Sequence, residues 1–235
     1  MAVQDERRDR LWQRVVGGAA RRDSSGWAGI VCHVVVDQVL VDGSAISMRG
    51  ANRSEELVAA SDDWSRHWEE LQYALGEGPG VDAHTEGGPV LVTDLTADSR
   101  WPGFTDVAVG AGLRAVFAFP LQTGAIQLGT LTMYRRRPAA LTADELADAA
   151  VLADVALTAL LTDIDGDDPA YWARESTPSH YEDVSVATGM LAVQLQISIE
   201  DAFARLQAHA FSHDRPLLEV ARDVLRRELR LDSSD

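Results

Sequence analysis

Three runs of apolar residues at helical spacing follow one another in the last quarter of the chain, from about residue 180 to residue 231. Their apolar positions are Val184, Ala187, Leu191 and Leu195, then Ala202, Leu206, Ala210 and Phe211, then Leu217, Val220, Ala221, Val224 and Leu225. Residues at this spacing share one face of a helix. Ser198 can cap the second helix, and Pro216 suits the first turn of the third. We therefore predict a three-helix unit, which is small for a core of its own and is expected to lean on a neighbour or a second copy.

The same stretch contains a longer pattern of residue types. It consists of Ala-Thr-Gly-Met at 187–190, a serine at 198, the segment 202–206, Ala-Phe at 210–211 and the segment 217–221. This order and spacing resemble an ANTAR domain, the RNA-binding output module of transcription antitermination regulators. The resemblance implies that residues 180–235 bind RNA as tandem hairpins near terminators, and that the bound protein prevents a terminator from forming.

The resemblance also implies a set of RNA-binding residues. They are Ala187, Thr188, Gly189, Met190, Ala202, Arg205, Leu206, His209, Ala210, Phe211, Arg222 and Arg226. Thr188 and Gln207 depart from the family pattern, because many members carry lysine and arginine there, and Arg205 compensates only in part. An alternative for each position is structural: small residues let helices approach closely, larger apolar ones form a core, and His209 is solvated or caps a helix.

The chain before residue 162 alternates helix-like and strand-like segments. Helices are expected at 5–22, 27–40, 61–75, 81–84, 100–110 and 143–161, and strands at 44–48, 56–60, 89–95, 115–122 and 127–134. A hairpin turn is expected at 51–53. Ser61 is the expected N-cap of the third helix, and Thr142 with Glu145 forms a capping box before the last one. An antiparallel sheet with helices before and after it defines an α+β fold.

Four short motifs in this region carry a second resemblance. They are Leu-Gln-Tyr-Ala-Leu-Gly-Glu-Gly-Pro at 71–79, Asp-Leu at 94–95, Arg-Trp-Pro at 100–102 and Ala-Phe-Pro-Leu at 118–121. They resemble the GAF domain that precedes ANTAR modules in actinobacterial regulators. The resemblance implies a sensory domain whose sheet forms the floor of a ligand pocket, and a homodimer formed through the terminal helices.

These patterns give a domain plan with four parts. An N-terminal helix covers 1–26, the GAF-like sensory domain 27–161, an acidic linker 162–179, and the ANTAR-like RNA-binding domain 180–235. The linker contains glycine, proline and several aspartates, whose mutual repulsion favours an extended segment.

The candidate ligand pocket of the GAF-like domain is expected to include His84, Trp101, Phe104, Phe117 and Phe119. Its ligand would be a small molecule of unknown identity, and no cofactor is predicted. The six histidines show no metal-ligand spacing, and the glycines at 76–80 lack the flanking strand and long helix of a phosphate-binding loop. Cys32, the single cysteine, is expected to be a buried structural thiol. With no catalytic constellation, we expect that the protein is not an enzyme.

Charge divides the chain unevenly. The formal net charge of −16 argues against general affinity for nucleic acid. Residues 205–230 nevertheless carry six arginines against four acidic residues, which permits selective contact with a folded RNA. No signal-peptide pattern opens the sequence and no apolar run is long enough to span a membrane, so a cytoplasmic location is expected.

Two functions therefore stand side by side. The first is a transcription antitermination regulator in which a GAF-like domain controls an ANTAR-like domain that binds tandem RNA hairpins. The alternative is a small-molecule or redox sensor whose helical C-terminal domain serves dimerisation or protein interaction without binding RNA. The neutral residues at 188 and 207 and the strong negative charge favour the alternative somewhat.

Overall fold

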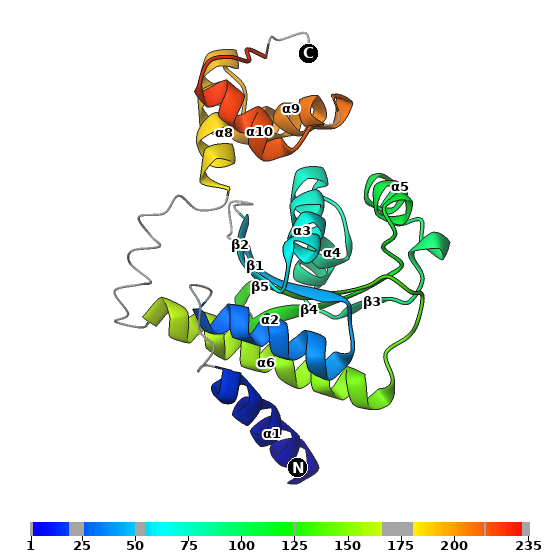
Figure 1. The fold of residues 1–235 in the computed structure, drawn as a ribbon. Helices are drawn as coiled ribbons and strands as arrows, with labels where there is room; N and C mark the ends of the chain where they lie inside the picture. The colour runs from blue at the N-terminus through cyan, green and yellow to red at the C-terminus, as the bar shows by residue number, and fades with distance from the viewer. Residues whose placement is uncertain are drawn as a thin grey trace. The chain divides into compact units, whose positions relative to one another are not determined.

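The computed structural model describes residues 2–18, 26–49, 55–124, 126–165, 181–213 and 215–231 (Figure 1). The chain divides into two units, Met1–Tyr171 and Trp172–Asp235. The turn expected at 51–53 and most of the expected linker lie outside the described residues.

The first unit is built on one five-stranded sheet in which every neighbouring pair is antiparallel. The strands are β1 (Gly43–Arg49), β2 (Glu55–Ala60), β3 (Val90–Val92), β4 (Ala115–Thr123) and β5 (Ile126–Arg135). Their order across the sheet is β2-β1-β5-β4-β3. The predicted α+β fold is confirmed, with all five strands near their expected positions and β3 shorter than expected.

Helices cover both faces of this sheet, as Figure 1 shows. On one side are α1 (Ala2–Gly18), α2 (Gly26–Val39) and α6 (Ala143–Asp165), and on the other are α3 (Asp63–Leu75), α4 (Pro79–Glu86), a 3-10 turn (Leu95–Ala97) and α5 (Pro102–Gly110). Alternation along β5 separates two interiors. Leu131 and Met133 join the hydrophobic core with α2 and α6, whereas Thr130, Thr132 and Tyr134 face α3 and α4.

The N-terminal helix is packed into the first unit. Leu11 and Val15 are fully buried in the core that α2 and α6 share, whereas Trp12 and Val16 are exposed at the surface. The apolar residues of α1 are therefore only partly covered. Residues 2–18 therefore pack as part of the first unit.

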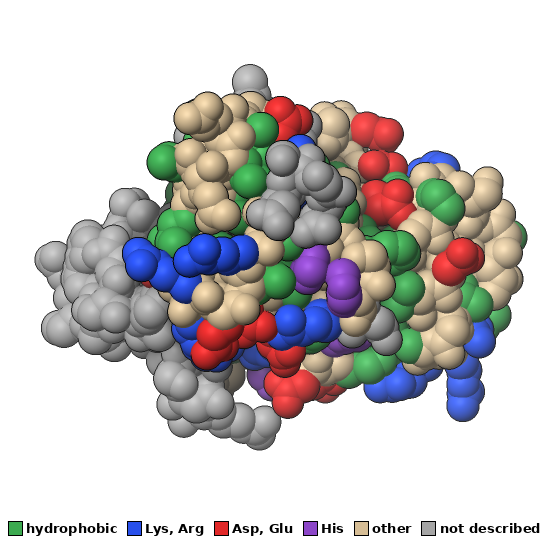
Figure 2. Space-filling model, turned by 90° about the horizontal axis from the view of Figure 1, so that it is seen from above, with side chains coloured by type: hydrophobic (Ala, Val, Ile, Leu, Met, Phe, Trp, Pro, Cys, Tyr) green, Lys and Arg blue, Asp and Glu red, His purple; other side chains and the backbone are tan. Residues whose placement is uncertain are grey.

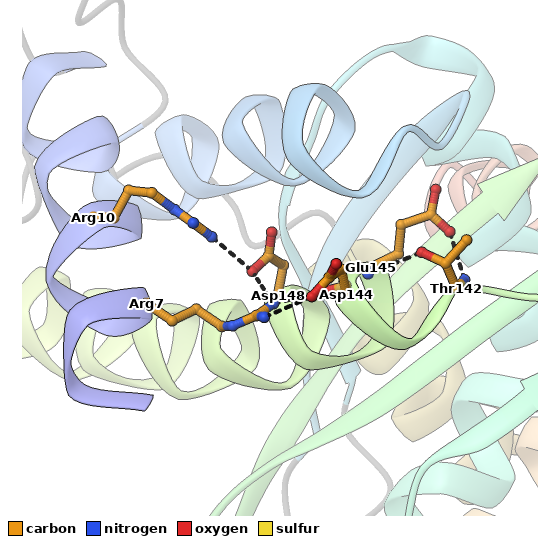
Figure 3. Close-up of polar contacts among 6 residues, drawn as sticks. All are labelled: Arg7, Arg10, Thr142, Asp144, Glu145 and Asp148. Carbon is orange, nitrogen blue, oxygen red and sulfur yellow. Dashed lines mark hydrogen bonds and ion pairs between the residues drawn. The ribbon is translucent and has the colours of Figure 1, made fainter. Parts of the chain in front are cut away.

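An ionic contact holds the same helix against α6 (Figure 3). Arg7 donates to Oδ1 of Asp148 at 2.6 Å and to Oδ1 of Asp144 at 2.8 Å, and Arg10 donates to Oδ1 of Asp148 at 3.0 Å. Asp148 thus accepts from two of the arginines of α1, Arg7 and Arg10. The helix that carries these carboxylates runs to residue 165, so the first residues of the expected linker are helical.

Local signals set where two helices begin. Thr142 N donates to Oε2 of Glu145 at 2.7 Å and Glu145 N donates to Oγ1 of Thr142 at 3.2 Å, which is the predicted capping box (Figure 3). At α3 the expected cap, Ser61, is wrong. Oδ1 of Asp62 accepts from Ser65 N at 2.7 Å, because the Ser61 hydroxyl already accepts the amide of a residue in β1 at 3.0 Å.

The second unit has the three expected helices, α8 (Glu182–Leu195), α9 (Ile199–Ser212) and α10 (Leu217–Leu225). Oγ of Ser198 accepts from Asp201 N at 3.0 Å, as predicted for the N-cap of α9. The buried residues include Val184, Ala187, Leu191, Ala202, Leu206, Ala210, Leu217, Val220, Ala221 and Val224. These are predicted apolar positions. Phe211 is the main exception, since 62% of it is exposed.

Candidate nucleic-acid interface and candidate sensory site

Five of the candidate RNA-binding side chains lie in the core of the second unit. They are Ala187, Thr188, Ala202, Leu206 and Ala210. The Thr188 hydroxyl donates to the carbonyl oxygen of Val184 at 2.7 Å, so its polar group is already satisfied. While the helices stay packed, these side chains cannot touch a ligand. In the described structure these five side chains pack the three helices together.

A groove lies on the surface between α8 and the end of α10 with the residues that follow it. Its volume is about 660 Å³. Its lining includes Gly189, Met190 and Val193 from α8, and Val224, Arg227 and Arg230 from α10 and the residues after it. Two of the sequence-derived candidates, Gly189 and Met190, therefore meet in one surface feature.

Two other candidate residues, Arg222 and Arg226, have acidic partners. Nε of Arg222 lies 2.9 Å from Oδ2 of Asp183. Nη1 of Arg226 lies 3.9 Å from Oδ1 of Asp223 and 3.8 Å from Oε2 of Glu228. A guanidinium with a carboxylate at this distance offers less net charge to a phosphate. Both residues therefore fit the role of phosphate ligands less well than the sequence suggested.

Arg227 and Arg230, which border the groove, are exposed. Within the described residues, neither forms an ion pair with a carboxylate. Beside them, Val193 is 81% exposed and Met190 is 36% exposed. Figure 2 shows arginine side chains next to hydrophobic ones on the face that it presents, with acidic side chains nearby. Exposed apolar area beside available cations suits unstacked bases and their phosphates.

The remaining candidates lie on α9. Phe211 presents its ring to solvent, and an exposed aromatic ring can stack on an unpaired base. The rings of His209 and His213 stack with their centroids 4.1 Å apart. Arg205 is half-buried. The three candidates on this helix, Arg205, His209 and Phe211, are not among the residues that line the groove.

Sequence reasoning missed Val193, Arg227 and Arg230 as site residues. Counting charges located a basic segment but did not rank its arginines. The ranking depends on ion pairs such as the one that joins Arg222 to Asp183, 39 positions away in the sequence. The signal that the sequence did offer for Arg227 was its place beside a second arginine, Arg226.

A buried polar network occupies the interior between the sheet and α3. Glu69 is 1% exposed, and its Oε2 accepts from the Ser47 hydroxyl at 2.6 Å, while its Oε1 accepts from the Tyr134 hydroxyl at 2.5 Å. Nε2 of Gln72 donates to the Tyr134 hydroxyl at 3.1 Å. Burial, followed by the charge of Glu69, raises the pKa of Tyr134 well above its ordinary value.

The glycine-rich turn between α3 and α4 extends this network. Oε1 of Gln72 accepts from Gly80 N at 2.7 Å. Gly78 has φ of +140°, and a Cβ there would stand 2.5 Å from Oε1 of Gln72. The turn therefore needs glycine for its backbone conformation and for close packing on Gln72, and this accounts for the sequence motif at 76–80.

The five candidate pocket residues do not share one cavity. Phe117 and Phe119 of β4 belong to the core with α2 and α6. The other three belong to elements on the opposite side of the sheet, since His84 lies on α4, Phe104 lies on α5, and Trp101 directly precedes α5. Trp101 donates from Nε1 to Oδ2 of a carboxylate on α4 at 2.9 Å, and Phe104 is fully buried. The sheet separates the two groups, which corrects the expected pocket.

Burial shifts the pKa of two residues with titratable side chains, His84 and Cys32, towards their neutral forms. Burial, and then Arg49, lowers the pKa of His84, whose Nδ1 has no hydrogen-bond partner within the described part of the chain. Burial raises the pKa of the Cys32 thiol to about 12. Among the described residues, no group of three or more histidine, cysteine or acidic side chains is placed to hold a metal ion.

The first unit is an antiparallel sheet between two helical layers, and the second is a set of three helices with a groove bordered by arginines, so the chain is an α+β protein of two units. A family model described as GAF domain matches residues 28–160, more than half of the chain. The chain therefore belongs to the GAF domain family. A second family model, described as ANTAR domain, matches residues 180–225.

Solved structures support the fold of the first unit. The GAF domain from a phosphoenolpyruvate-protein phosphotransferase of Coxiella burnetii is similar with a TM-score of 0.50 and 13% identity, covering 68% of this chain and 94% of that chain. The GAF domain from the Acinetobacter phosphoenolpyruvate-protein phosphotransferase gives a TM-score of 0.50 and 12% identity, covering 74% and 96%. Identities this low speak for the fold alone. No curated protein matched the chain. None of the described helices is long and apolar enough to cross a membrane.

Proposed function

We propose that this protein is a transcription antitermination regulator whose second unit binds tandem RNA hairpins. The observation that carries the proposal is the groove in which Arg227 and Arg230 border the exposed side chains of Met190 and Val193, on the unit that matches the ANTAR family. Holding a hairpin pair would keep the overlapping terminator from forming. Because this acts on a nascent transcript, the proposal places the protein in the cytoplasm. It assigns the chain no catalysis.

The charge distribution supports selective rather than general binding. A net charge of −16 repels polyanions over most of the surface. Two guanidinium groups at the groove can each neutralise a phosphate, and each released counterion adds to the salt dependence of binding. Apolar contacts from Met190 and Val193 add a part of the affinity that salt does not weaken. RNA with unstacked loop bases should therefore compete well against duplex RNA.

A mobility-shift titration tests this function. RNA with two adjacent hairpins is compared with RNA carrying either hairpin alone, at one fixed salt concentration. We expect the tandem RNA to bind at least tenfold more tightly, because a homodimer would present two equal units to two hairpins. Equal affinity for tandem and single hairpins, in a protein shown to be dimeric, would contradict the proposal.

We further propose that the first unit senses a small molecule on the α3 and α4 side of its sheet. Supporting groups are the Thr130 hydroxyl and Nδ1 of His84, which are buried without a hydrogen-bond partner in the part of the chain that is described. Buried polar groups are normally paired, so these two could receive a ligand. Differential scanning calorimetry of the protein with members of a metabolite library would identify such a ligand, because a ligand that binds the folded state raises the unfolding temperature.

A second candidate function rests on a different observation. Val186, Met190 and Val193 are all exposed and lie at spacings of four and three residues on α8. Such an apolar stripe is also typical of a helix that docks on another protein or on a second copy. Val193→Asp and the wild type together separate the two functions. The protein-interaction alternative is favoured if the wild type binds no RNA and Val193→Asp disrupts the dimer.

A further inference from the structure

Arg227 holds a backbone conformation that favours glycine. Its φ is +62°, in the left-handed region, where a side chain is disfavoured. At the end of α10 its amide donates to the Val224 carbonyl at 3.0 Å, and the Glu228 amide donates to the Asp223 carbonyl at 2.9 Å. These two hydrogen bonds define a Schellman motif, in which the left-handed residue is usually glycine. An arginine here lowers the stability of the helix end, so local structure does not account for it.

Gly189 presents the opposite case on α8. It lies inside the helix, where glycine is less favourable than alanine. A Cβ placed on it would meet no heavy atom of the described residues within 4 Å beyond its own stretch of helix. Close packing of helices within the second unit therefore does not account for this glycine. An alanine would fit there and would stabilise the helix.

Both residues line the same groove. Departures from local propensity are expected where a residue serves function instead of stability. Glycine lets a ligand approach the helix backbone closely. The hydrogen bonds that end α10 fix the backbone from which the exposed Arg227 side chain extends. The groove volume of about 660 Å³ lies in the range of about 300–1,000 Å³ that suits small organic groups.

We propose that Gly189 and Arg227 form a subsite for one unstacked nucleotide of the bound RNA, an inference that rests on the proposed function. The base lies against the backbone of α8 at Gly189, with the exposed side chains of Met190 and Val193 beside it. The guanidinium of Arg227 pairs with the phosphate of the same nucleotide. The residues at 189 and 227 thus serve RNA binding at the expense of helix stability.

The subsite predicts that stability and RNA affinity change in opposite directions. Arg227→Gly should raise the unfolding temperature by about 4–8 °C, because it relieves the left-handed strain. It should bind tandem-hairpin RNA about tenfold more weakly, and the magnitude of its salt slope should fall by about one. Gly189→Ala should also be more stable and bind about tenfold more weakly, because its methyl group occupies the place of the base. Its salt slope should not change, since no charge is removed.

Gln196 provides a matched control in the same unit. It ends α8 with φ of +56°, and the Ile197 amide donates to the Ala192 carbonyl at 3.1 Å, so the two helices end alike. It is not among the residues that line the groove. Gln196→Gly should therefore raise the unfolding temperature as Arg227→Gly does and keep wild-type RNA affinity and salt slope. Gly17→Ala in α1 adds a methyl group at another open helical glycine and should also keep wild-type RNA affinity.

Two measurements on the full-length variants test the subsite. Circular dichroism at 222 nm during heating gives the unfolding temperature, and fluorescence anisotropy of a labelled tandem hairpin gives the affinity at several salt concentrations. If the wild type binds this RNA and either Arg227→Gly or Gly189→Ala binds it equally well, the subsite is wrong and the proposed function stands. An unfolding temperature of Arg227→Gly at or below that of the wild type would also overturn the subsite. A wild type that does not bind the RNA would overturn both.

Discussion

The Ser47 hydroxyl of β1 donates a hydrogen bond of 2.6 Å to Oε2 of Glu69 on α3, inside the first unit. The other carboxyl oxygen accepts from Tyr134 of β5. A buried carboxylate is costly unless its oxygens are satisfied. These two hydroxyl donors therefore fix where α3 sits on the sheet, on the side where we propose that a ligand is sensed.

Replacing Tyr134 by phenylalanine should destabilise the first unit. The change leaves Oε1 of Glu69 without this donor, which costs about 1–3 kcal/mol for a buried polar group. Urea unfolding followed by tryptophan fluorescence measures the loss. In the double variant Glu69→Leu with Tyr134→Phe, much of the loss should be recovered, because the unsatisfied acceptor is removed. Full wild-type stability of the single variant would contradict the role of the network.

The same phenol predicts a stability change at high pH. The folded pKa of Tyr134 is raised well above the value of about 10 for an exposed tyrosine. The unfolded chain therefore loses its proton first as pH rises, and the free energy of unfolding should fall above pH 10. Tyr134→Phe should show a smaller fall over the same range in parallel titrations. An identical decline in both proteins would show that Tyr134 does not contribute.

Asp148 and Asp144 form a matched pair for testing how α1 is held. Both accept from Arg7, but the Asp148 side chain is 13% exposed and also receives Arg10, whereas the Asp144 side chain is 91% exposed. Exposed ion pairs contribute little, while a partly buried carboxylate with two guanidinium partners contributes more. Asp148→Asn should lower the urea midpoint, and Asp144→Asn should leave it nearly unchanged. Equal shifts would argue against a specific contact.

Cys32 should be unreactive in the folded protein. Its pKa of about 12 keeps the thiol protonated at pH 8, and its side chain is fully buried. Only the thiolate is the nucleophile, so iodoacetamide should label Cys32 slowly in the folded protein. Labelling should be rapid in about 8 M urea, because the unfolded chain exposes the thiol. Mass spectrometry gives the labelled fraction over time. Rapid labelling of the folded protein would revive the redox-sensor alternative.

Ser198 provides the N-cap of α9, and its replacement tests the second unit. Ser198→Ala removes the acceptor for Asp201 N and should cost about 1 kcal/mol, whereas Ser198→Asp retains an acceptor. Ser185→Ala, at an exposed position within α8, is the matched control and should have little effect. Helical signal at 222 nm during thermal unfolding reports the change. A loss as large in Ser185→Ala would point to a nonspecific effect.

Features governed by neighbours in the sequence were predictable. The capping box of Thr142 and Glu145, the Ser198 cap and the helical apolar faces all depend on residues within a few positions of one another. The five strands were also found, because their alternation and turns are local. The Ser61 cap failed, since a strand amide had already engaged that hydroxyl.

Features governed by tertiary contacts were not predictable. Strand alternation places Phe117 and Phe119 on one face, but the helices that cover that face are known only from the fold. The acidic partner of Arg222 lies in another helix, so its charge could not be discounted from the sequence. Family resemblance likewise marked Ala202 as a site residue without revealing that it is buried.

The central claim is that RNA binds at the groove bordered by Arg227 and Arg230. The most direct measurement is the salt dependence of tandem-hairpin binding for Arg227→Ala with Arg230→Ala, compared with Arg222→Ala with Arg226→Ala. Each lost phosphate contact should reduce the slope of log affinity against log salt by about one. We predict that the magnitude of the slope falls by about two in Arg227→Ala with Arg230→Ala. It should fall by less in Arg222→Ala with Arg226→Ala, whose arginines are ion-paired. A groove variant that binds with wild-type affinity and slope would contradict the account.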